Sequence, residues 1–526
     1  MRKIAAYIFL LLIWAEASAQ VHFDADFESG SLGQVKLLNS YRGYSSGRLA
    51  THLYYRIEGN YDPRNPVDTK LFPSANWYYF RMTGTAGKHL HLTFPNNTVA
   101  GSSYSYDGQE WSHFTMSESD MTNINKYFDR DTVFLALYKP YTYSYLQERL
   151  QEWTARPCVE LDTIGFSCEG RPLQMLHITD PEVPSEGKSR IWVHGRTHPS
   201  ETPGSFLVDG LVEYLTEDSP HGEALRRQID AYILPFSNPD GVYDGRSRSN
   251  AIGINQEINY DRGDDSTTVE VQAIKSMFKR LTADRPLDFM LNSHSQLLAC
   301  SCFWLHRSSS TSLDFLRRQW AFAGLVCSQN PCIAPREMRF SEALPRYPEG
   351  WFWQHAGDKT MALTVETPHF YYNLNSRGLW VDDDNLRFFG KRILQAMAEY
   401  LGMSIPGRII VDTPSEIEEG WTEYRSPDRS FLGDCAWEAL EAGAVVNYSL
   451  DSLKWGKYDV YRFVPGDCLE TDDNLRTRRG WTDPGVHGWV YRETVLQEAT
   501  GPFSYSFTAE EAGDLADALL IIRVED

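Results

Sequence analysis

The stretch Arg190–Phe206, RIWVHGRTHPSETPGSF, places two metal-binding residue types on a turn between a strand and a helix. Ile191–Val193 is a short apolar run rich in β-formers, which predicts a buried strand. Apolar residues at helical spacing over Phe206–Leu215 predict that a helix follows the turn. His198 and Glu201 therefore lie at the carboxyl end of a strand, where open α/β sheets bind ligands. Imidazole and carboxylate are ligands of Zn²⁺, and a catalytic zinc needs three protein ligands.

The length and charge of the chain limit the classes of protein to consider. The chain has 526 residues, which predicts two to four domains, and its hydrophobic content of 42% is that of a globular protein. The formal net charge is −21, and the acidic residues are spread along the chain. Nucleic-acid binding is not expected, because it calls for a basic patch.

The first 19 residues have the pattern of a cleaved secretory signal. Arg2 and Lys3 precede an apolar run over residues 4–14, and Ala17-Ser18-Ala19 fits a small-x-small cleavage site. The apolar run is shorter than the roughly 20 residues that a membrane-spanning helix needs. We therefore predict a signal peptide at 1–19, export to the periplasm or the extracellular space, and no membrane span.

Export would permit disulfides among the eight cysteines. We expect Cys158–Cys168 to close a hairpin and Cys435–Cys468 to pair in the C-terminal segment. The other four, Cys300, Cys302, Cys327 and Cys332, would pair among themselves with undetermined connectivity. The alternative is that the cysteines are buried free thiols.

Three segments differ in their pattern of apolar residues. Residues 20–145 contain aromatic, strand-like runs broken by turn residues, which predicts an antiparallel β-sandwich with the aromatics in its core. Residues 146–403 alternate between strands and helices, which predicts an α/β domain with a mixed, mostly parallel sheet flanked by helices. Residues 404–526 return to short strands and predict a C-terminal β-sandwich, through which a glycan or protein contact could be made.

Two further strands of the α/β segment end in chemically active residues. Leu287–Leu291 leads to His294, and Met361–Val365 leads to Glu366. Because both residues follow apolar strands, we expect them at the same sheet edge as His198. A turn at residues 237–242 leads into a loop with Arg246 and Arg248, and arginine suits a carboxylate or a developing oxyanion.

These motifs occur in an order that resembles the zinc carboxypeptidases. The motifs are HPSE at 198–201, LPFSNPDGV at 234–242 with the arginine loop after it, NSHSQ at 292–296 and LTVET at 363–367. The resemblance covers roughly residues 21–402 and is closest to the branch that includes the cytosolic carboxypeptidases, in which a β-sandwich precedes the catalytic domain. It implies a peptide substrate and one Zn²⁺ per chain.

The resemblance also implies a role for each matching residue. The zinc ligands would be His198, Glu201 and His294. Glu366 would be the general base. Arg248 would polarise the scissile carbonyl, with Arg246 as the alternative for that role.

Two positions depart from the pattern of the family. Glu257-Ile258 stands where the family often has the Asn-Arg pair that holds a substrate carboxylate, and a shifted match puts Asn259 there and leaves Arg262 nearby. We therefore name Arg246, Glu257 and Asn259 as candidate substrate-binding residues. Family members often have two histidines one residue apart, which leaves Asn292 as an alternative slot to His294. Tyr347 is a candidate for the tyrosine that closes over substrate in many relatives.

The predicted function is zinc-dependent hydrolysis of a terminal peptide or amide bond. Because Glu257 would repel a substrate carboxylate and attract an ammonium group, ordinary carboxyl termini need not be the substrate. The alternatives are a zinc-dependent deacylase or amidase that acts on small or cell-wall-derived substrates, and a glycan- or peptide-binding protein with a degenerate peptidase core.

Overall fold

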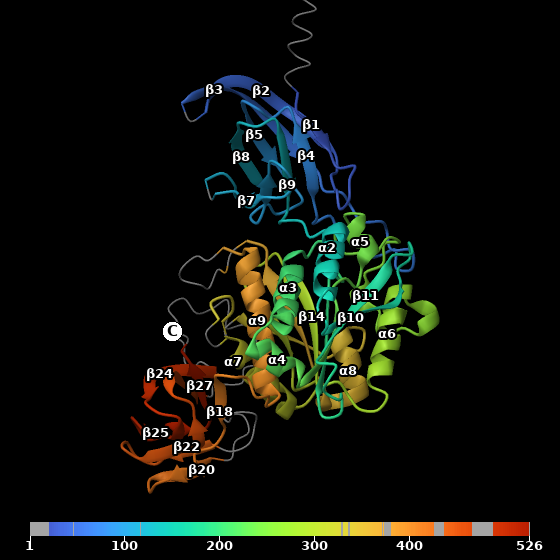
Figure 1. Cartoon of the computed structure of the whole chain (residues 1–526). Helices are drawn as coiled ribbons and strands as arrows, with labels where there is room; N and C mark the ends of the chain where they lie inside the picture. Colours follow the sequence, from blue (N-terminus) through green and yellow to red (C-terminus); the bar gives the residue numbers. More distant parts are fainter. Residues whose placement is uncertain are drawn as a thin grey trace, which may run out of the picture.

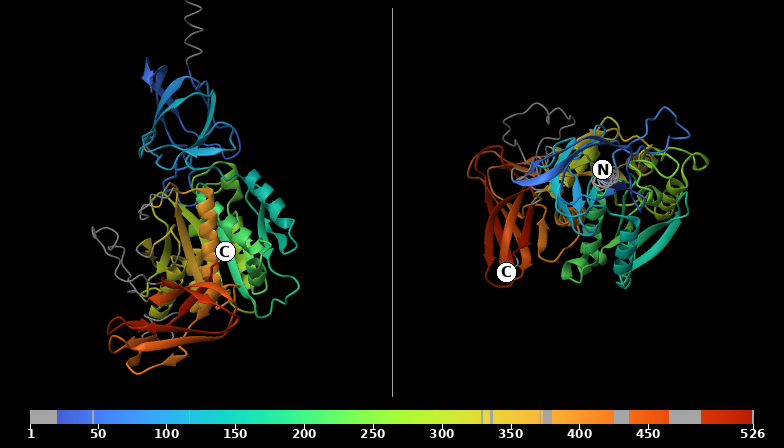
Figure 2. Two further views of the ribbon diagram at one scale, coloured as in Figure 1. Left: turned by 60° about the vertical axis from the view of Figure 1, so that its left-hand side comes forward. Right: turned by 90° about the horizontal axis from the view of Figure 1, so that it is seen from above.

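The computed structural model describes residues 20–45, 47–115, 117–327, 330–334, 337–370, 372, 380–424, 436–464 and 488–524. Figure 1 shows two N-terminal β-sheets, a large mixed sheet covered by helices, and a group of small C-terminal β-sheets. The N-terminal and C-terminal sheets lie at opposite ends of the helical part (Figure 2). This arrangement confirms the predicted fold class. Within the described ranges, we find no helix whose length and apolarity would let it span a membrane.

The N-terminal segment forms two sheets that share one aromatic core. The first sheet has the order β1 (His22–Asp24), β4 (Tyr79–Thr83), β9 (Thr132–Ala136), β6 (Ser103–Ser105) and β7 (Trp111–His113). The second has the order β2 (Val35–Ser45), β3 (Arg48–Ile57), β5 (Lys88–Thr93) and β8 (Asn123–Phe128). Alternate residues of both sheets, such as Tyr55, Phe80 and Leu90, are buried in one cluster. Aromatic residues such as Tyr55, Trp77 and Phe80 are therefore core, as predicted, whereas Tyr44 and Phe72 are exposed.

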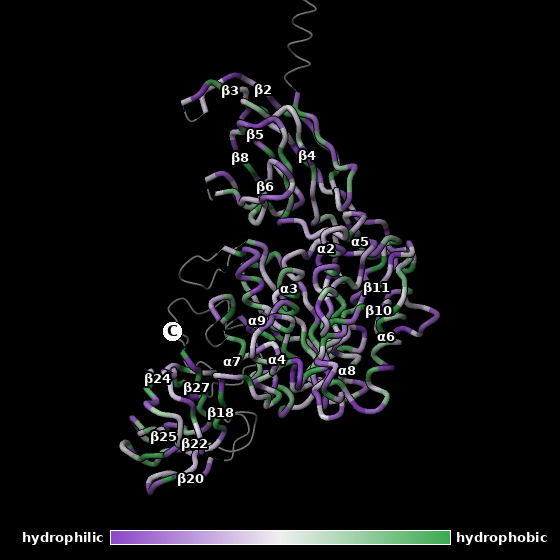
Figure 3. The backbone as a smooth tube through the Cα atoms, in the orientation of Figure 1, coloured by the Kyte–Doolittle hydropathy of each residue, from purple (hydrophilic) through white to green (hydrophobic). Residues whose placement is uncertain are grey.

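The central sheet has eight strands and carries the candidate site at its middle. Its order is β10 (Val159–Phe166), β11 (Pro172–Ile178), β13 (Ile229–Leu234), β12 (Ser189–Gly195), β14 (Phe289–Gln296), β17 (Met361–Pro368), β15 (Cys302–His306) and β16 (Arg339–Ser341). The four strands from β13 to β17 run parallel, and β10 and β11 run antiparallel to their neighbours. Strand β15 pairs antiparallel with β17 and parallel with β16. Hydrophobic residues gather on the strands in the middle of this part (Figure 3). The parallel strands are continuous apolar runs in the sequence, because helices cover both faces of the sheet.

The helices of the central part follow the strands closely. They are α2 (Tyr143–Thr154), α3 (Pro203–Thr216), α4 (Pro220–Arg226), α5 (Pro239–Tyr243), α6 (Val269–Leu281), α7 (Leu313–Cys327), α8 (Pro348–Ala356) and α9 (Asp383–Tyr400), with short 3₁₀ turns η1 (Gln256–Ile258), η2 (Asp264–Ser266) and η4 (Gly357–Lys359). Helix α9 begins with a capping box on Asp382 and is followed by Gly402 in the left-handed conformation.

Helices α3 and α9 approach so closely that their backbones touch. A Cβ atom added to Gly390 would lie 2.0 Å from the carbonyl oxygen of Leu207, and one added to Gly210 would lie 2.0 Å from that of Arg387. Glycine is therefore required on both helices at this crossing. The contact holds α3, whose N-terminus follows the HPSE turn, against the rest of the domain.

The C-terminal segment forms three small sheets that pack on the central part. Their strands are β18 (Arg408–Val411), β27 (Leu519–Arg523), β23 (Gly456–Val464) and β24 (Gly488–Gln497); β19 (Glu416–Ile417), β22 (Val445–Leu453) and β25 (Gly501–Thr508); and β20 (Trp421–Tyr424), β21 (Ala436–Ala439) and β26 (Leu515–Ala516). Phe463, Trp489 and Leu520 belong to the main core of the central part. The C-terminal sheets are therefore joined to it by apolar contacts.

The predicted disulfides are wrong wherever the structure describes the cysteines concerned. Cys158 and Cys168 are free thiols, and so are Cys300, Cys302 and Cys332. Strand β10 separates Cys158 from Cys168, and its eight residues span about 26 Å at 3.3 Å per residue. A disulfide needs Cα atoms within about 7 Å. The predicted pair Cys435–Cys468 lies outside the described residues, as does the predicted signal peptide.

Candidate metal centre

The residues of the candidate site come from the ends of three adjacent parallel strands. Strand β12 pairs with β14, and β14 pairs with β17, so that His294 lies directly beside Glu366 in the register. The turn after β12 carries His198 and Glu201 to the same edge. The order of the strands therefore brings these strand ends together, as we expected from the sequence.

The turn after β12 is held by Arg196, which has a positive φ of 54°. Its buried guanidinium donates hydrogen bonds to the carbonyl oxygens of Pro199 and Tyr141, and burial lowers its pKa to about 9. A non-glycine residue in this conformation is strained and needs support from its surroundings. These bonds fix the path of the chain just before His198.

His198, Glu201 and His294 form a compact buried group. Their candidate ligand atoms all lie within 4.8 Å of one another. The Glu201 carboxylate bridges the two rings: Oε1 lies 2.8 Å from His198 Nδ1, and Oε2 lies 2.7 Å from His294 Nδ1. The three side chains are at most 9% exposed. Two imidazoles and one carboxylate are the ligand types that a zinc site of this kind uses.

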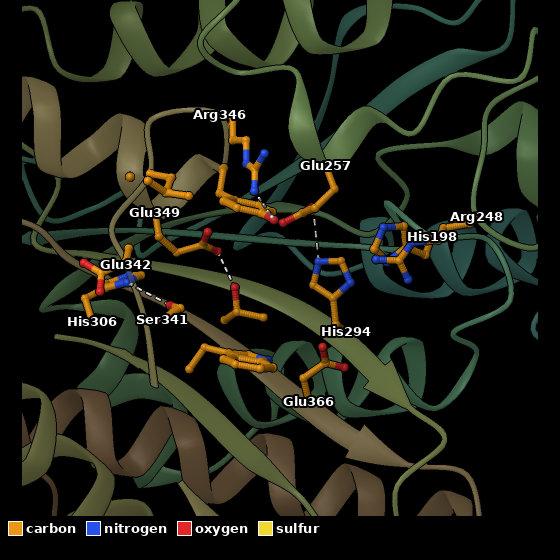
Figure 4. A pocket seen from close by; sticks show the side chains of 15 residues that line it. His198, Arg248, Glu257, His294, His306, Ser341, Glu342, Arg346, Glu349 and Glu366 are labelled. Atoms are coloured by element: carbon orange, nitrogen blue, oxygen red, sulfur yellow. Dashed lines mark hydrogen bonds and ion pairs between the residues drawn. The ribbon is translucent and has the colours of Figure 1, made fainter. Parts of the chain in front are cut away.

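The opposite nitrogen of each imidazole faces an oxygen. His198 Nε2 lies 3.3 Å from Asn255 Oδ1, and His294 Nε2 lies 3.2 Å from Glu257 Oε2 (Figure 4). Histidines that bind metal usually direct their second nitrogen to a carbonyl or carboxylate in this way, which sets the tautomer and the ring orientation. Both Nδ1 atoms are therefore oriented toward the carboxylate of Glu201, and the group fits a zinc ion in residue type and orientation.

Charge interactions within the group are strong because it is buried. Burial opposes ionisation of Glu201, but the two histidines beside it hold the pKa of this carboxyl well below its usual range. Burial similarly opposes ionisation of Glu257, whose pKa the neighbouring His294 lowers to about 2. Glu201 and Glu257 thus bring negative charge to this candidate metal-binding group, which favours a cation at its centre.

Glu366 lies next to this group at the end of β17. Its side-chain atom Oε2 is buried and has no hydrogen-bond partner in the part of the chain that the structure describes. Burial, and then the charge of Glu201, raise the pKa of Glu366 to about 8. A carboxyl group with a raised pKa beside a metal-binding group can accept and release a proton.

Arg248 reaches the same group from the loop after α5. Its Nη1 lies 3.8 Å from Glu201 Oε1, and its side chain is 46% exposed. Arg248, His198, His294 and Glu366 line one cavity of about 320 Å³. Figure 4 shows Arg248 and His198 on one side of His294, and Glu349 on the other.

Of the three remaining candidate residues, one lines the cavity and two do not. Glu257 lines the cavity but contacts His294 and the amide of Asn292. The guanidinium of Arg246 pairs with Asp244 at 3.2 Å, and the Asn259 amide bonds the carbonyl of Asn255; neither is among the residues that line the cavity.

Two residues raised as alternatives also take definite positions. Asn292 is buried on β14 between Glu257 and Glu349, with its amide 2.9 Å and 3.0 Å from their oxygens. Tyr347 lines the cavity beside Arg346.

Sequence reasoning missed several residues of the site. Asn255 and Glu349 lie around the metal-binding group, and Asp62 binds the Arg248 loop from the N-terminal segment. Asn255 lies two residues before Glu257, within the motif compared with the family, and could have been found from it. Asp62 has no local signal, because its partners lie 185–187 residues away in sequence.

Comparisons with known proteins agree with this geometry. The family model for zinc carboxypeptidases matches residues 143–321. Cytosolic carboxypeptidase 6 of Homo sapiens is 30% identical over 321 residues, which cover 58% of this chain and 63% of that protein. The Mus musculus protein of the same name is 28% identical and covers 58% of each chain. Cytosolic carboxypeptidase 2 of Danio rerio is 32% identical over 174 residues, 24% of its length. The chain thus spans less than two thirds of these relatives.

Solved structures share the fold. A metallo-carboxypeptidase from Burkholderia cenocepacia superimposes with a TM-score of 0.60 at 20% identity, covering 73% of this chain and 99% of that one. One from Pseudomonas aeruginosa, solved with (2-guanidinoethylmercapto)succinic acid, gives 0.58 at 19% identity, covering 72% and 99%.

The comparisons contradict the prediction of export. The curated relatives are named cytosolic carboxypeptidases, and the free thiols of the described cysteines remove the disulfides that export was expected to permit. We therefore withdraw the prediction of a periplasmic or extracellular location.

Proposed function

From the zinc carboxypeptidase domain at residues 143–321, whose homologues include cytosolic carboxypeptidases, we propose that this chain is a zinc-dependent hydrolase of a terminal peptide or amide bond. One observation supports the proposal above all: His198 and His294 of the buried His198–Glu201–His294 group line one cavity with Glu366, whose Oε2 has no hydrogen-bond partner among the described residues. The three residues would hold one zinc ion per chain. When bound, Zn²⁺ supplies a Lewis acid that acidifies a water molecule and polarises a carbonyl group.

Glu366 is the general base of the proposed reaction. Its Oε2 accepts a proton from the attacking water and later delivers it to the leaving amine nitrogen. Trp304, which interacts with the Glu366 carboxyl group, and the neighbouring strands hold this side chain in place. Because Oε2 has no hydrogen-bond partner among the described residues, its proton-accepting position is open to the reaction.

Arg248 stabilises the negative charge that develops on the carbonyl oxygen. Its guanidinium lies at the border of the cavity and keeps about half of its surface accessible to a substrate. An arginine offers several donors in one plane and keeps its charge at every relevant pH. Loss of one such donor costs about 2.7–4 kcal/mol of transition-state stabilisation.

The substrate of the proposed hydrolase need not carry a free carboxyl terminus. Glu257 brings a negative charge to the cavity wall, and Ile258 cannot donate a hydrogen bond from its side chain. An ammonium group, from a basic side chain or a free amine, would be attracted to Glu257. Arg346 is a cation on the same wall and is the residue that a carboxylate would use instead.

A panel of peptides with free, amidated and diamino-acid ends tests this view of the substrate. We expect comparable cleavage of free and amidated ends and the best cleavage of a diamino-acid end. A strong preference for a free, unmodified carboxyl terminus would overturn the substrate proposal and point to Arg346.

A deacylase or amidase acting on a small substrate is the second candidate function. The cavity of about 320 Å³ supports it, because this is at the lower end of the volumes of ligand pockets, about 300–1,000 Å³. Acylated amino acids and cell-wall-derived peptides in the same assay panel distinguish it from a peptidase.

A binding protein with a degenerate core is less well supported. A protein that only binds has no need of a proton acceptor beside a ligand group. The zinc content of the purified protein and the activity of Glu366→Gln decide between the two. A glycan or protein contact through the C-terminal sheets would use their exposed aromatic side chains, Trp455 and Tyr491.

A further inference from the structure

One carboxylate of the N-terminal segment binds three consecutive main-chain N–H groups of the arginine loop. Asp62 Oδ1 accepts a hydrogen bond from Ser247 N at 2.7 Å. Asp62 Oδ2 accepts from Arg248 N at 2.8 Å and from Ser249 N at 3.0 Å. Asp62 is 6% exposed. Successive N–H groups that point into one concavity form an anion-binding nest, and here the anion is a side chain from another part of the chain.

Asp62 itself lies on a supported loop between β3 and β4. Its own N–H donates to the carbonyl oxygen of Ser74 at 2.8 Å. Nearby, the N–H of Trp77 donates to Ser247 Oγ at 2.9 Å, and the Trp77 indole donates to the carbonyl of Ser29 at 2.8 Å. The N-terminal sheets therefore hold the arginine loop at several points, and Asp62 provides three of these bonds.

The same loop is bonded on its other side to the turn that carries the metal-binding residues. The carbonyl oxygen of Ser247 accepts hydrogen bonds from Ser200 N at 3.2 Å and from Ser200 Oγ at 2.7 Å. Ser200 lies between His198 and Glu201. Ser247 therefore links the two sides: its N–H bonds to Asp62, and its carbonyl oxygen bonds to Ser200 of the HPSE turn.

The side chain of Arg248 has little support of its own. Its guanidinium lies 3.8 Å from the Glu201 carboxylate, and the side chain is 46% exposed. The position of the guanidinium therefore depends on where the main chain of the loop places the Arg248 Cα atom. Displacement of a catalytic group by about 1 Å can cost about 100-fold in rate.

We propose that Asp62 is a positioning residue of the active site, which holds Arg248 in place through the main chain of its loop, so that the N-terminal sheets are an obligatory part of the catalytic unit. The inference rests on the proposed function, because it takes Arg248 as the residue that stabilises the developing charge. It predicts that Asp62 affects the rate through Arg248 and has no independent effect.

The test compares Asp62→Ala, Asp62→Asn, Arg248→Ala and the double variant Asp62→Ala/Arg248→Ala in the full-length, zinc-loaded protein. Asp68→Ala is the matched control, because Asp68 is a partly exposed carboxylate of the same segment whose side chain accepts a hydrogen bond from Lys70 N of its own loop and makes none to the arginine loop. The measurements are zinc content, kcat and KM on a peptide substrate, and hydrogen exchange of the amides at 247–249.

We expect kcat to fall about 10- to 100-fold in Asp62→Ala, with a smaller change in KM, full zinc content, and faster exchange at 247–249. Asp62→Asn, which keeps one acceptor oxygen, should fall between Asp62→Ala and the unchanged protein. The double variant should be no slower than Arg248→Ala alone, and Asp68→Ala should behave like the unchanged protein.

Three results would overturn the proposal. Unchanged exchange at 247–249 in Asp62→Ala would show that Asp62 does not hold the loop. Faster exchange at 247–249 with an unchanged kcat in Asp62→Ala would show that the bonds from Asp62 to the loop do not affect the reaction. Losses that multiply in the double variant would show that Asp62 acts independently of Arg248. If Arg248→Ala alone leaves kcat unchanged, the proposed role of Arg248 in the reaction is wrong. The exchange data would then still show whether Asp62 holds the main chain of the loop.

Discussion

The substitution Glu366→Gln is the sharpest test of the proposed chemistry. It keeps the size of the side chain and removes its ability to accept a proton. Within the described ranges Glu366 Oε2 has no hydrogen-bond partner, so the substitution breaks no described bond at that atom. The change also removes a buried ionisable group whose pKa is raised to about 8, which should not lower stability. Zinc binding should persist, because the ligand atoms belong to other residues.

The expected loss of rate is that of a general base. Removal of such a group lowers the rate about 10²- to 10⁴-fold. At 1.36 kcal/mol for each factor of ten, this equals about 2.7–5.4 kcal/mol of transition-state stabilisation. The assay is the steady-state kcat on the best peptide of the panel, with zinc measured by elemental mass spectrometry and folding by thermal denaturation.

Glu270→Gln is a matched control for the loss of a buried carboxylate. Glu270 is fully buried on α6, accepts a hydrogen bond from Cys168 N at 3.0 Å, and does not line the cavity. We expect the kcat of Glu270→Gln to stay within about twofold of that of the unchanged protein, because Glu270 lies outside the cavity and takes no part in the proton transfer. If Glu366→Gln keeps more than a tenth of the original kcat with full zinc content, Glu366 is not the general base.

Three further predictions follow from the site, the helix crossing and the N-terminal sheets. Arg248→Ala should lower kcat about 10²- to 10³-fold without loss of zinc, measured by kinetics and elemental analysis, because one donor to the developing charge is removed. Gly390→Ala should destabilise the protein by about 1–3 kcal/mol in a denaturant titration, because the added Cβ would meet the Leu207 carbonyl at 2.0 Å. Thermal stability should fall as the pH decreases from about 6.5 to 4. Burial, and the charge of neighbouring histidines, lower the pKa of His89 in the folded protein to about 4. Between these pH values His89 binds a proton in the unfolded chain but not in the folded one, so acid favours unfolding. His89→Asn should reduce this dependence.

Each of these predictions has a clear contrary result. An Arg248→Ala variant that keeps most of its kcat would remove the arginine from the mechanism. Gly263→Ala, whose Cβ would meet only Ser266 Oγ at 3.7 Å, is the control for Gly390→Ala, and equal effects of the two would contradict the helix-contact argument. A His89→Asn variant with the full pH dependence would assign the effect to other groups, such as His91 or His113, whose pKa values are also lowered by burial.

The parts of the site that follow apolar strands were predictable from the sequence. His198, His294 and Glu366 stand at the ends of short apolar runs, and such runs become parallel neighbours in an α/β sheet. The helix ends were also predictable where the cap is local, as at Asp382 and Gly402. In both cases the signal lies within a few residues of the feature.

The parts that depend on distant partners were not predictable. Glu257 lines the cavity, but its contacts with His294 and Asn292 of strand β14 had no local signal in the sequence. The strand β10 was missed because its exposed residues, such as Glu160 and Asp162, hide its pattern. That missed strand is also the reason why the Cys158–Cys168 disulfide was wrong.

The register of β14 against β17 has a consequence for how this chain can change in evolution. Successive side chains of a strand point to opposite faces, so an insertion or deletion of one residue inside β14 or β17 would turn His294 or Glu366 away from the cavity. Length changes should therefore be excluded from these two strands and confined to the connections between them. Among sequences related to this one, we expect gaps in the segment between β15 and α8, and none in the segments 289–296 and 361–368.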